Sequence, residues 1–300
     1  MSCIYILTSY LRSMTSQNLH TDEERYPATA GSFYPRDPVD LSRMIAKFMA
    51  ESGKVVNSGN IQAVIAPHAG YMYSGPVAAS AYKQLEGLKY DRVVVISPSH
   101  TTFFTGCSIY NGQAYVTPLG KLFIDTDMTA RLADINPSKI YLSARGHTGG
   151  GMRQEHSLEV QLPFLQLVLG DFKLVPIVMG EQEWDVISAL GESLASAFEN
   201  SSTLIVASTD LSHFHSSDIA SEKDSLIRQK VEDFDPEGLY KTIAEGKAEA
   251  CGGGPMTAAM IAAKKLGAKH STVTDYADSG EITGDRSEVV GYLAAVLHGD

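Results

Sequence analysis

Three apolar segments of strand length are each followed, within a few residues, by a histidine. The segments cover residues 61–66, 92–97 and 203–208, and the histidines after them are His68, His100 and His213. Short continuous apolar runs of this kind are typical of strands that are buried on both faces. In an open α/β sheet, ligands bind beyond the carboxyl ends of parallel strands, so the three histidines are expected to meet at one edge.

Helical patterns separate these strand-like runs. Asp37 and Pro38 occupy the cap and first position of an amphipathic helix that ends at Gly53. Residues 77–88 form a second helical pattern, which leads back to the next apolar run and therefore predicts a parallel β-α-β unit. Strands and helices continue to alternate towards the end of the chain. Further strands are expected at residues 172–179, 203–208, 271–277 and 289–296, and further helices at residues 184–198, 218–231, 236–245 and 255–266.

This alternation predicts a single three-layer α/β/α domain over residues 25–300, with a mostly parallel central sheet. Residues 1–24 show no periodicity and are expected to form a poorly ordered lead-in, within which Met14 is an alternative start. Residues 1–13 lack a basic segment and a cleavage site, so no signal peptide is expected. The following segment, residues 25–35, is rich in aromatic residues, Gly and Pro, and is expected to pack as an irregular strap.

Composition and charge narrow the range of partners. The formal net charge of −11 and the absence of any basic run argue against a nucleic-acid partner and against an anionic membrane surface. No apolar stretch approaches the roughly 18 residues that a membrane span needs. The cysteines Cys3, Cys107 and Cys251 are too few and too scattered for a disulfide framework. These features predict a cytoplasmic protein.

The polar residues beside the histidines predict metal binding or proton transfer. A neutral imidazole is the commonest metal ligand in proteins. Asp210 lies three residues before His213, where a carboxylate can assist a proton-transferring histidine. A single loop histidine is more often a surface group, but three together favour a site. A Ser-His-Asp hydrolase built from Ser99, His100 and Asp210 is an alternative, disfavoured because the chain has no Gly-x-Ser-x-Gly elbow.

Cys251 precedes three glycines at the start of a predicted helix. The helix dipole and the free N–H groups there would favour the thiolate, which is the form that binds metals. The glycines would permit a close approach of the backbone to a ligand. The alternative is a buried apolar thiol, which is how we interpret Cys107.

Glu155 and His156 stand before another predicted helix. Ser157 and Gln161 are in capping-box register, and Pro163 is expected to kink this helix. A carboxylate in a first turn often serves only as a cap. Glu155 and His156 are therefore either capping residues or part of a ligand site.

Taken together, these motifs resemble those of the Memo family. They follow one another in order over nearly the whole chain from Arg25 onwards, and as a set they are highly specific. The matching segments are residues 25–35, 66–75 (Ala-Pro-His-Ala-Gly-Tyr-Met-Tyr-Ser-Gly), 97–100, 155–163 (Glu-His-Ser-Leu-Glu-Val-Gln-Leu-Pro), 208–213 (Ser-Thr-Asp-Leu-Ser-His), 251–252, 276–280 and 284–285.

The resemblance implies the fold of the LigB-type class III extradiol dioxygenases, with a non-haem metal pocket at the strand ends. It makes His68, His100 and Cys251 the metal-pocket residues. Asp210 and His213 would be the catalytic residues beside them, His213 matching the acid/base histidine of the dioxygenases. Tyr71, Glu155 and His156 are expected to line the substrate pocket, which completes the predicted set.

The resemblance also leaves two classes of function open. The dioxygenases use Glu where this chain has Cys251, and a thiolate makes the site softer and more hospitable to copper or zinc. One transition metal ion is expected, Fe(II) or copper in preference to zinc, unless the pocket is empty. The first class is a metal-dependent redox or oxygenase-type activity on an unknown substrate. The second is a non-catalytic module that binds a phosphopeptide or small ligand. The family's microbial setting further implies AMMECR1-like and radical SAM proteins as partners.

Overall fold

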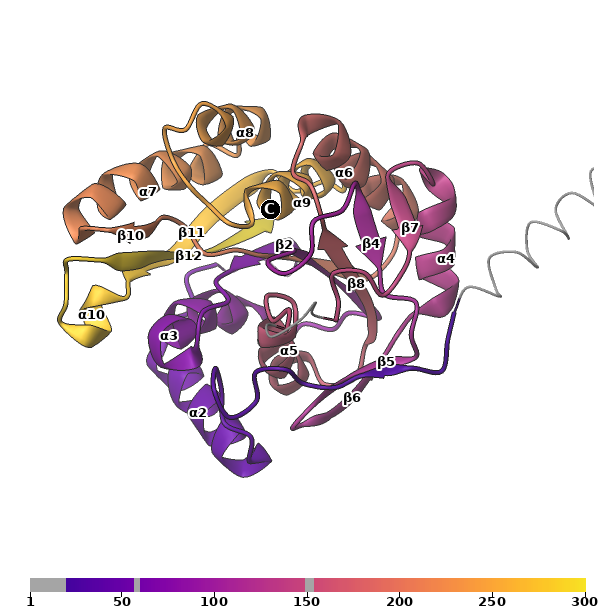
Figure 1. Cartoon of the computed structure of the whole chain (residues 1–300), viewed down its shortest axis with the longest axis horizontal. Helices are drawn as coiled ribbons and strands as arrows, with labels where there is room; N and C mark the ends of the chain where they lie inside the picture. The colour runs from indigo at the N-terminus through magenta and orange to yellow at the C-terminus, as the bar shows by residue number, and fades with distance from the viewer. Residues whose placement is uncertain (1–19, 57–59, 149–153) are drawn as a thin grey trace, which may run out of the picture.

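The computed structural model describes residues 20–56, 60–148 and 154–300 of the chain. Within them, nine strands form a large sheet through the centre of the molecule (Figure 1). Their order is β10, β12, β2, β9, β3, β8, β4 and β7, with β11 also paired to β12. The strands are β2 (Ile61–Ala66), β3 (Arg92–Pro98), β4 (Cys107–Ile109), β7 (Ile140–Leu142), β8 (Lys173–Met179), β9 (Thr203–Ser208), β10 (His213–His215), β11 (His270–Asp278) and β12 (Val289–His298).

The four strands at the middle of this sheet, β2, β9, β3 and β8, run parallel to one another. Every residue of β2 and β9 is buried, as expected for parallel strands covered by helices. The margins differ, because β12 is antiparallel to β2 and β4 is antiparallel to β8. Only a short segment with the helix α10 (Gly280–Thr283) joins β11 to β12, and so short a connection permits only an antiparallel pair. The prediction of a mostly parallel sheet therefore holds for its centre, while the whole sheet is mixed.

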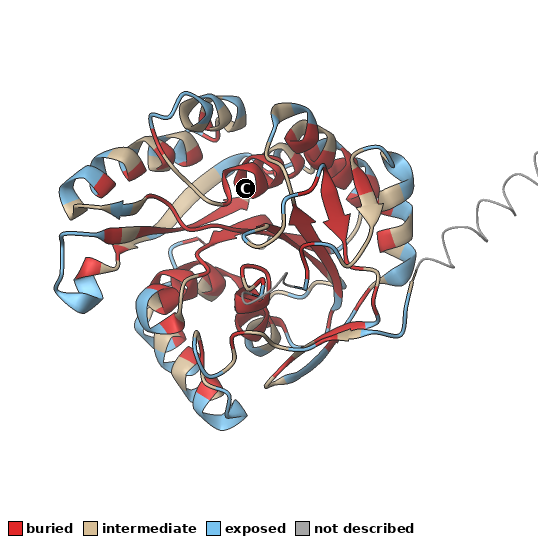
Figure 2. Ribbon diagram, viewed as in Figure 1, coloured by how far each residue is buried: buried red, intermediate tan, exposed pale blue. Residues whose placement is uncertain are grey.

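Helices cover both faces of the sheet, which confirms the three-layer α/β/α arrangement (Figure 1). Neighbouring residues of a strand point to opposite faces: Val93 and Val95 of β3 belong to one core cluster, and Val94 and Ile96 to the other. Figure 2 shows buried residues along the sheet and on the helix faces turned towards it. The first face carries α2 (Pro38–Glu51), α3 (Tyr71–Tyr82) and α5 (Leu162–Leu169); the second carries α4 (Thr126–Ile135), α6 (Trp184–Phe198), α7 (Ser217–Glu232), α8 (Pro236–Ala244) and α9 (Gly253–Lys265). None of the helices in the described part of the chain is long and apolar enough to span a membrane.

The predicted start of α2 is confirmed in detail. The side chain of Asp37 accepts hydrogen bonds from the backbone N–H groups of Val39 and Asp40, and Pro38 is in the first turn. This cap satisfies N–H groups that have no partner within the helix. The apolar face then buries Leu41, Ile45 and Met49 against the core.

Two other helix boundaries differ from the prediction. The helix expected over residues 77–88 begins at Tyr71, includes Pro76, and is followed by a 3-10 turn, η1 (Lys83–Leu85). Pro163 does not kink α5 but stands in its first turn, after the 3-10 turn η2 (Glu159–Gln161). A missing N–H is harmless in a first turn. Ser157 caps no helix; its hydroxyl donates instead to the carbonyl of Pro98 (2.9 Å).

A small second sheet holds the start of the described chain. It consists of β1 (Glu24–Arg25), β5 (Ala114–Thr117) and β6 (Gly120–Phe123). The backbone N–H of Thr21 already donates to the carbonyl of Asn111 (2.8 Å). The prediction of a poorly ordered lead-in up to residue 24 is therefore wrong for residues 20–24, which pair with the rest of the chain, and residues 1–19 lie outside the described residues.

The segment after β1 is fastened by Glu159, a fully buried residue of η2. The Glu159 carboxylate accepts hydrogen bonds from the N–H of Ala28 (2.7 Å) and from the N–H and hydroxyl of Thr29 (3.0 and 2.9 Å). The guanidinium of Arg25 and the hydroxyl of Tyr34 also donate to it. Because Arg25 is only 4% exposed, this is a buried ion pair, and it holds the predicted strap (residues 25–35) against the domain.

Candidate metal centre

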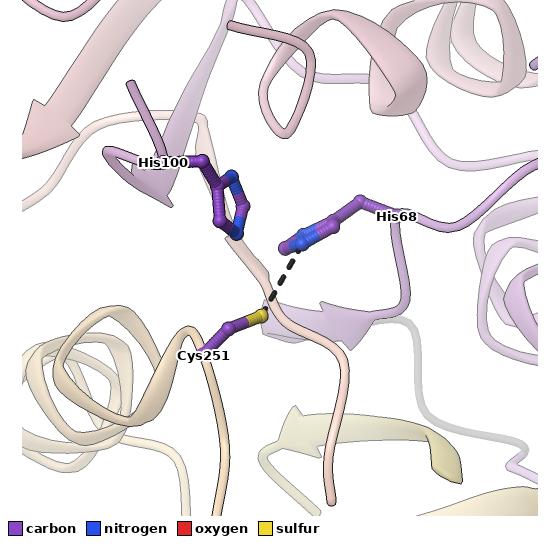
Figure 3. Close-up of side chains that lie close together, drawn as sticks. All are labelled: His68, His100 and Cys251. Atoms are coloured by element: carbon purple, nitrogen blue, oxygen red, sulfur yellow. Dashed lines mark hydrogen bonds between the residues drawn. The ribbon is translucent and has the colours of Figure 1, made fainter. Parts of the chain in front are cut away.

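His68, His100 and Cys251 lie together at one edge of the sheet (Figure 3). His68 follows β2 and His100 follows β3, and these two strands lie on either side of β9. One ligand atom from each of the three residues lies within 4.8 Å of the others. The sulfur of Cys251 is 3.3 Å from Nε2 of His68, and the imidazole centroids of His68 and His100 are 5.1 Å apart. The proximity expected from the parallel strand ends is thus present.

His68 is almost fully buried and held on two sides. Its backbone N–H donates to Oδ1 of Asp210 (2.8 Å), and its Nδ1 lies 2.9 Å from the hydroxyl oxygen of Ser208. Burial, with the neighbouring His100 and His156 rings, holds the pKa of His68 well below its ordinary value of 6.5. The imidazole is therefore neutral, as a metal ligand must be.

His100 is held by Glu155, whose side chain is only 2% exposed. The Glu155 carboxylate accepts a hydrogen bond from the His100 backbone N–H (2.5 Å) and lies 3.0 Å from its Nδ1. It also accepts hydrogen bonds from the N–H groups of His156 and Ser157, and one of its oxygens lies 2.8 Å from the Ser157 hydroxyl oxygen. Burial would lower the pKa of His100, but the Glu155 carboxylate outweighs it and raises that pKa.

This geometry changes the interpretation of Glu155. His100, Glu155 and His156 also bring ligand atoms within 4.8 Å of one another. The carboxylate oxygens of Glu155 are nevertheless already engaged by four N–H groups, so Glu155 orients His100, and its place in a substrate pocket stays a prediction. A carboxylate behind a histidine is a common support for metal ligands.

Cys251 approaches the site on a turn that is bonded to the end of β9. Its sulfur accepts a hydrogen bond from the Asp210 N–H (3.2 Å), and the Cys251 N–H donates to the Asp210 carbonyl (3.2 Å). A Cβ at Gly252 would lie 2.2 Å from the Ser208 carbonyl oxygen, so only glycine fits there. Burial, with a contribution from Asp210, raises the pKa of the Cys251 thiol. α9 begins only at Gly253, so Cys251 stands before its first turn, and in the metal-free protein burial outweighs the predicted effect of the helix dipole.

Asp210 contacts the backbone of His68 and the sulfur of Cys251, whereas His213, the third predicted histidine, contributes no ligand atom to the cluster and acts on His68 and Asp210 electrostatically. Burial raises the pKa of Asp210 to about 6, although the His68 N–H and the His213 charge act against it. Nδ1 of His213 lies 2.7 Å from the carbonyl of Leu211, which can only accept, so Nδ1 carries the proton and Nε2 is left with a lone pair. The next residue, Phe214, is 72% exposed and has a positive φ of 61°, which is unusual for an aromatic residue.

His156 completes a cluster of three imidazoles with His68 and His100. Tyr71, by contrast, is buried in the core. The His156 ring stacks on His100 with a centroid distance of 5.1 Å and meets His68 edge-on at 5.7 Å. Phe33 packs against its other side at 4.7 Å. Tyr71 is 1% exposed and donates its hydroxyl to a backbone carbonyl, that of Val160 (2.7 Å). Tyr71 therefore anchors the start of α3 in the core, and its place in a substrate pocket stays a prediction.

The sequence of the whole chain matches the profile of the Memo-like protein family over residues 25–296. The chain belongs to the Memo family. It is 40% identical over 278 residues to a MEMO1 family protein of Methanothermobacter thermautotrophicus, covering 89% of this chain and 98% of that protein. It is 39% identical to a MEMO1 family protein of Sulfolobus acidocaldarius (92% and 99% covered) and 37% identical to one of Methanopyrus kandleri (91% and 99% covered). A crystal structure of an uncharacterized Escherichia coli K12 protein, JW3007, shares 13% identity at a TM-score of 0.49, with 79% and 99% covered, and that similarity supports no conclusion.

In this Memo family protein, the three converging side chains suit one transition metal ion. Bonds of about 2.0–2.3 Å in a tetrahedral arrangement place ligand atoms roughly 3.3–3.8 Å apart, close to the separations found here. The separation of 3.3 Å between Cys251 Sγ and His68 Nε2 is near that range, and the remaining pairs lie within 4.8 Å. Two imidazoles and one thiol leave at least one coordination position free, which is the arrangement of catalytic sites and not of closed structural ones.

Two residues behind the site were missed in the sequence. Ser208 and Gln161 are both buried and lie within hydrogen-bond distance of one another, and Ser208 contacts His68. The sequence pattern places Gln161 in a capping box instead. Its position between Leu158 and Leu162 indicates a buried amide, and because an unpaired buried amide is costly, a hydrogen-bond partner could have been expected.

Proposed function

We propose that this protein binds one transition metal ion through Nε2 of His68, Nε2 of His100 and Sγ of Cys251, and uses it in redox or oxygenase-type chemistry. The observation that carries the proposal is the convergence of these three atoms at the parallel strand ends, with Nδ1 of both histidines already engaged. Imidazole and thiolate ligands together suit copper, zinc and iron, and of these copper and iron could support redox chemistry. When bound, such an ion would supply a Lewis acid and a redox centre.

The residues of the chain beside the three ligands have distinct tasks in this proposal. His213 keeps its Nδ1 proton on Leu211, so its Nε2 is the atom that takes or returns a proton of the substrate. Asp210 fixes the turn before Cys251 and the backbone of His68. His156, stacked on His100, forms the wall against which a substrate would lie.

Metal content is the direct test. Protein purified anaerobically, without chelator or affinity metal, should contain about one equivalent of iron or copper by mass spectrometry, and the His68→Ala and Cys251→Ala variants should lose it. Two matched controls should keep it: Cys107→Ala, a buried thiol far from the site in sequence and packed in the second core cluster, and His270→Ala, an exposed histidine. Protein that holds no metal, and takes up neither Fe(II) nor Cu(I), would contradict the proposal.

That negative result would favour the second class of function, in which the pocket binds a phosphopeptide or small ligand without turnover. Calorimetry with phosphotyrosine at millimolar concentration would then separate a binding module from an inactive pocket. The partnership with AMMECR1-like and radical SAM proteins stays a prediction from the family resemblance, and co-purification from a microbial host would test it.

A further inference from the structure

The hydroxyl of Ser208, at the end of β9, has three polar neighbours in the buried interior. Its oxygen is 2.7 Å from the carbonyl oxygen of Ser157, 2.7 Å from Nε2 of Gln161, and 2.9 Å from Nδ1 of His68. A hydroxyl has one hydrogen to donate and two lone pairs to accept with. The direction of each of these three hydrogen bonds can therefore be assigned from its neighbours.

The orientation of the Gln161 amide is fixed first. Its Nε2 lies 2.9 Å from the carbonyl oxygen of Pro67 and 3.3 Å from that of Ala66, and carbonyl oxygens only accept. Its Oε1 accepts from the hydroxyl of Tyr82 (2.7 Å). The opposite orientation would place Oε1 against two carbonyl oxygens, so the nitrogen must face Ser208 and donate to it.

The Ser208 hydrogen is fixed next. Two oxygens 2.7 Å apart are repulsive unless a hydrogen lies between them, and the Ser157 carbonyl has none. Ser208 therefore donates to Ser157 and accepts from Gln161, which leaves one lone pair for His68. Nδ1 of His68 must supply the proton of that last hydrogen bond.

We infer that Ser208, with its hydrogen on the Ser157 carbonyl and Gln161 on one lone pair, is a positioning residue that holds His68 in the Nδ1–H tautomer and so presents the Nε2 lone pair to the metal site. The inference rests on the proposed metal-binding function. It explains the geometry on the far side of the ring, where Nε2 of His68 faces Cys251 Sγ at 3.3 Å. The two histidines also differ in the group behind Nδ1, since His68 is supported by a neutral hydroxyl and His100 by the carboxylate of Glu155.

The neighbouring strand provides a matched control. Ser97 of β3 stands one residue after Ile96, which is paired with Ala207, so Ser97 and Ser208 occupy corresponding positions on adjacent strands. Both are fully buried. Within the described residues, the hydroxyl of Ser97 has no hydrogen-bond partner. Ser97→Ala therefore removes a buried hydroxyl from the same layer without touching the chain of hydrogen bonds to His68.

The test is ¹⁵N NMR of the imidazole nitrogens in metal-free protein, with His68 assigned from the signals lost in His68→Gln. Wild-type protein should show a protonated Nδ1 and a bare Nε2 for His68. In Ser208→Ala the Nδ1 proton loses its acceptor, so the two tautomers should mix, and the dissociation constant for Fe(II) should rise about 10–100-fold, as for other supports of metal ligands. Ser97→Ala should match wild type in both the His68 tautomer and the dissociation constant for Fe(II).

Gln161→Met provides a second variant of similar size. It removes a donor to Ser208 but leaves the Ser157 carbonyl on the Ser208 hydrogen, so His68 should stay protonated at Nδ1, and an Nε2–H population in this variant would contradict the assignment of that hydrogen. A wild-type His68 protonated at Nε2 would overturn the inference, as would a Ser208→Ala variant no different from Ser97→Ala in both tautomer and affinity. If wild-type protein takes up no metal, the proposed function fails, but the nitrogen shifts of the metal-free protein still decide the tautomer.

Discussion

Glu159→Gln should lower the free energy of unfolding by about 3–5 kcal/mol, the usual cost of removing one partner of a buried ion pair. The substitution keeps the size of the side chain but leaves Arg25 charged and unpaired in the interior. The NH₂ group of the new glutamine must also face hydrogen-bond donors, because both carboxylate oxygens of Glu159 accept hydrogen bonds. One oxygen accepts from Arg25 and Ala28, and the other accepts from Thr29 and Tyr34.

The expected shift in melting temperature follows from chain length. An unfolding entropy of about 2.1 cal/mol/K per residue gives roughly 0.6 kcal/mol/K for a chain of 300 residues. A loss of 3–5 kcal/mol therefore corresponds to a decrease of roughly 5–8 °C at pH 7, measured by calorimetry. Glu192→Gln is the control, since Glu192 pairs with Lys265 at the surface and should shift the melting temperature by less than about 1 °C.

The pH dependence of this difference tests its electrostatic origin. Burial acts to raise the pKa of Glu159, but the Arg25 charge and the hydrogen bonds from Tyr34 and Ala28 outweigh it, so that pKa lies below the ordinary 4.5. A carboxyl with a lowered native pKa stabilises the fold above its unfolded pKa and loses that contribution as the pH falls through the native value. The gap between wild type and Glu159→Gln should therefore narrow below about pH 4.5. The reasoning would be refuted if Glu159→Gln lowered the melting temperature by less than about 1 °C at pH 7, or if its difference from wild type grew as the pH fell.

Two substitutions nearer the site have expected outcomes of their own. Glu155→Gln should weaken metal binding about 10–100-fold in a chelator competition, because His100 loses the carboxylate behind its Nδ1; an unchanged affinity would show that Glu155 does not orient His100. Gly252→Ala should destabilise the protein by about 1–3 kcal/mol and release the metal, because its Cβ would meet the Ser208 carbonyl and push away the turn that carries Cys251. Gly53→Ala, whose Cβ would meet nothing within 4 Å, is its control, and a Gly252→Ala variant that is stable and fully metallated would disprove the steric argument.

The parts of the fold that the sequence predicts correctly are those with local signals. β2, β3 and β9 are short apolar runs between polar loops, and their period and length suffice to identify them. The start of α2 follows from Asp37 and Pro38, whose effect on the helix extends over a few residues. The meeting of His68 with His100 follows in turn from the parallel direction of the strands that precede them.

The remaining features depend on contacts between distant residues. Gln161 and Ser208 are 47 positions apart, and neither has a local pattern that indicates the other. The thiol of Cys251 has its pKa raised by burial, and the extent of that burial is set by the packing of the turn on β9, not by its own neighbours in sequence. Tyr71 appears in a motif with His68, yet only the core around α3 shows that its side chain is packed there.

The position of β2 has a consequence for how the site is made. This strand, which leads into His68, lies between β9 and β12, so its neighbours in the sheet come from residues 203–208 and 289–298. During synthesis on the ribosome, β2 emerges early and must wait without either partner, and backbone pairing over such sequence separations forms slowly. Residue 251 also emerges well before β12. The strand that carries His68 therefore gains both neighbours only when β12 arrives, and until then a nascent chain exposes one edge of β2.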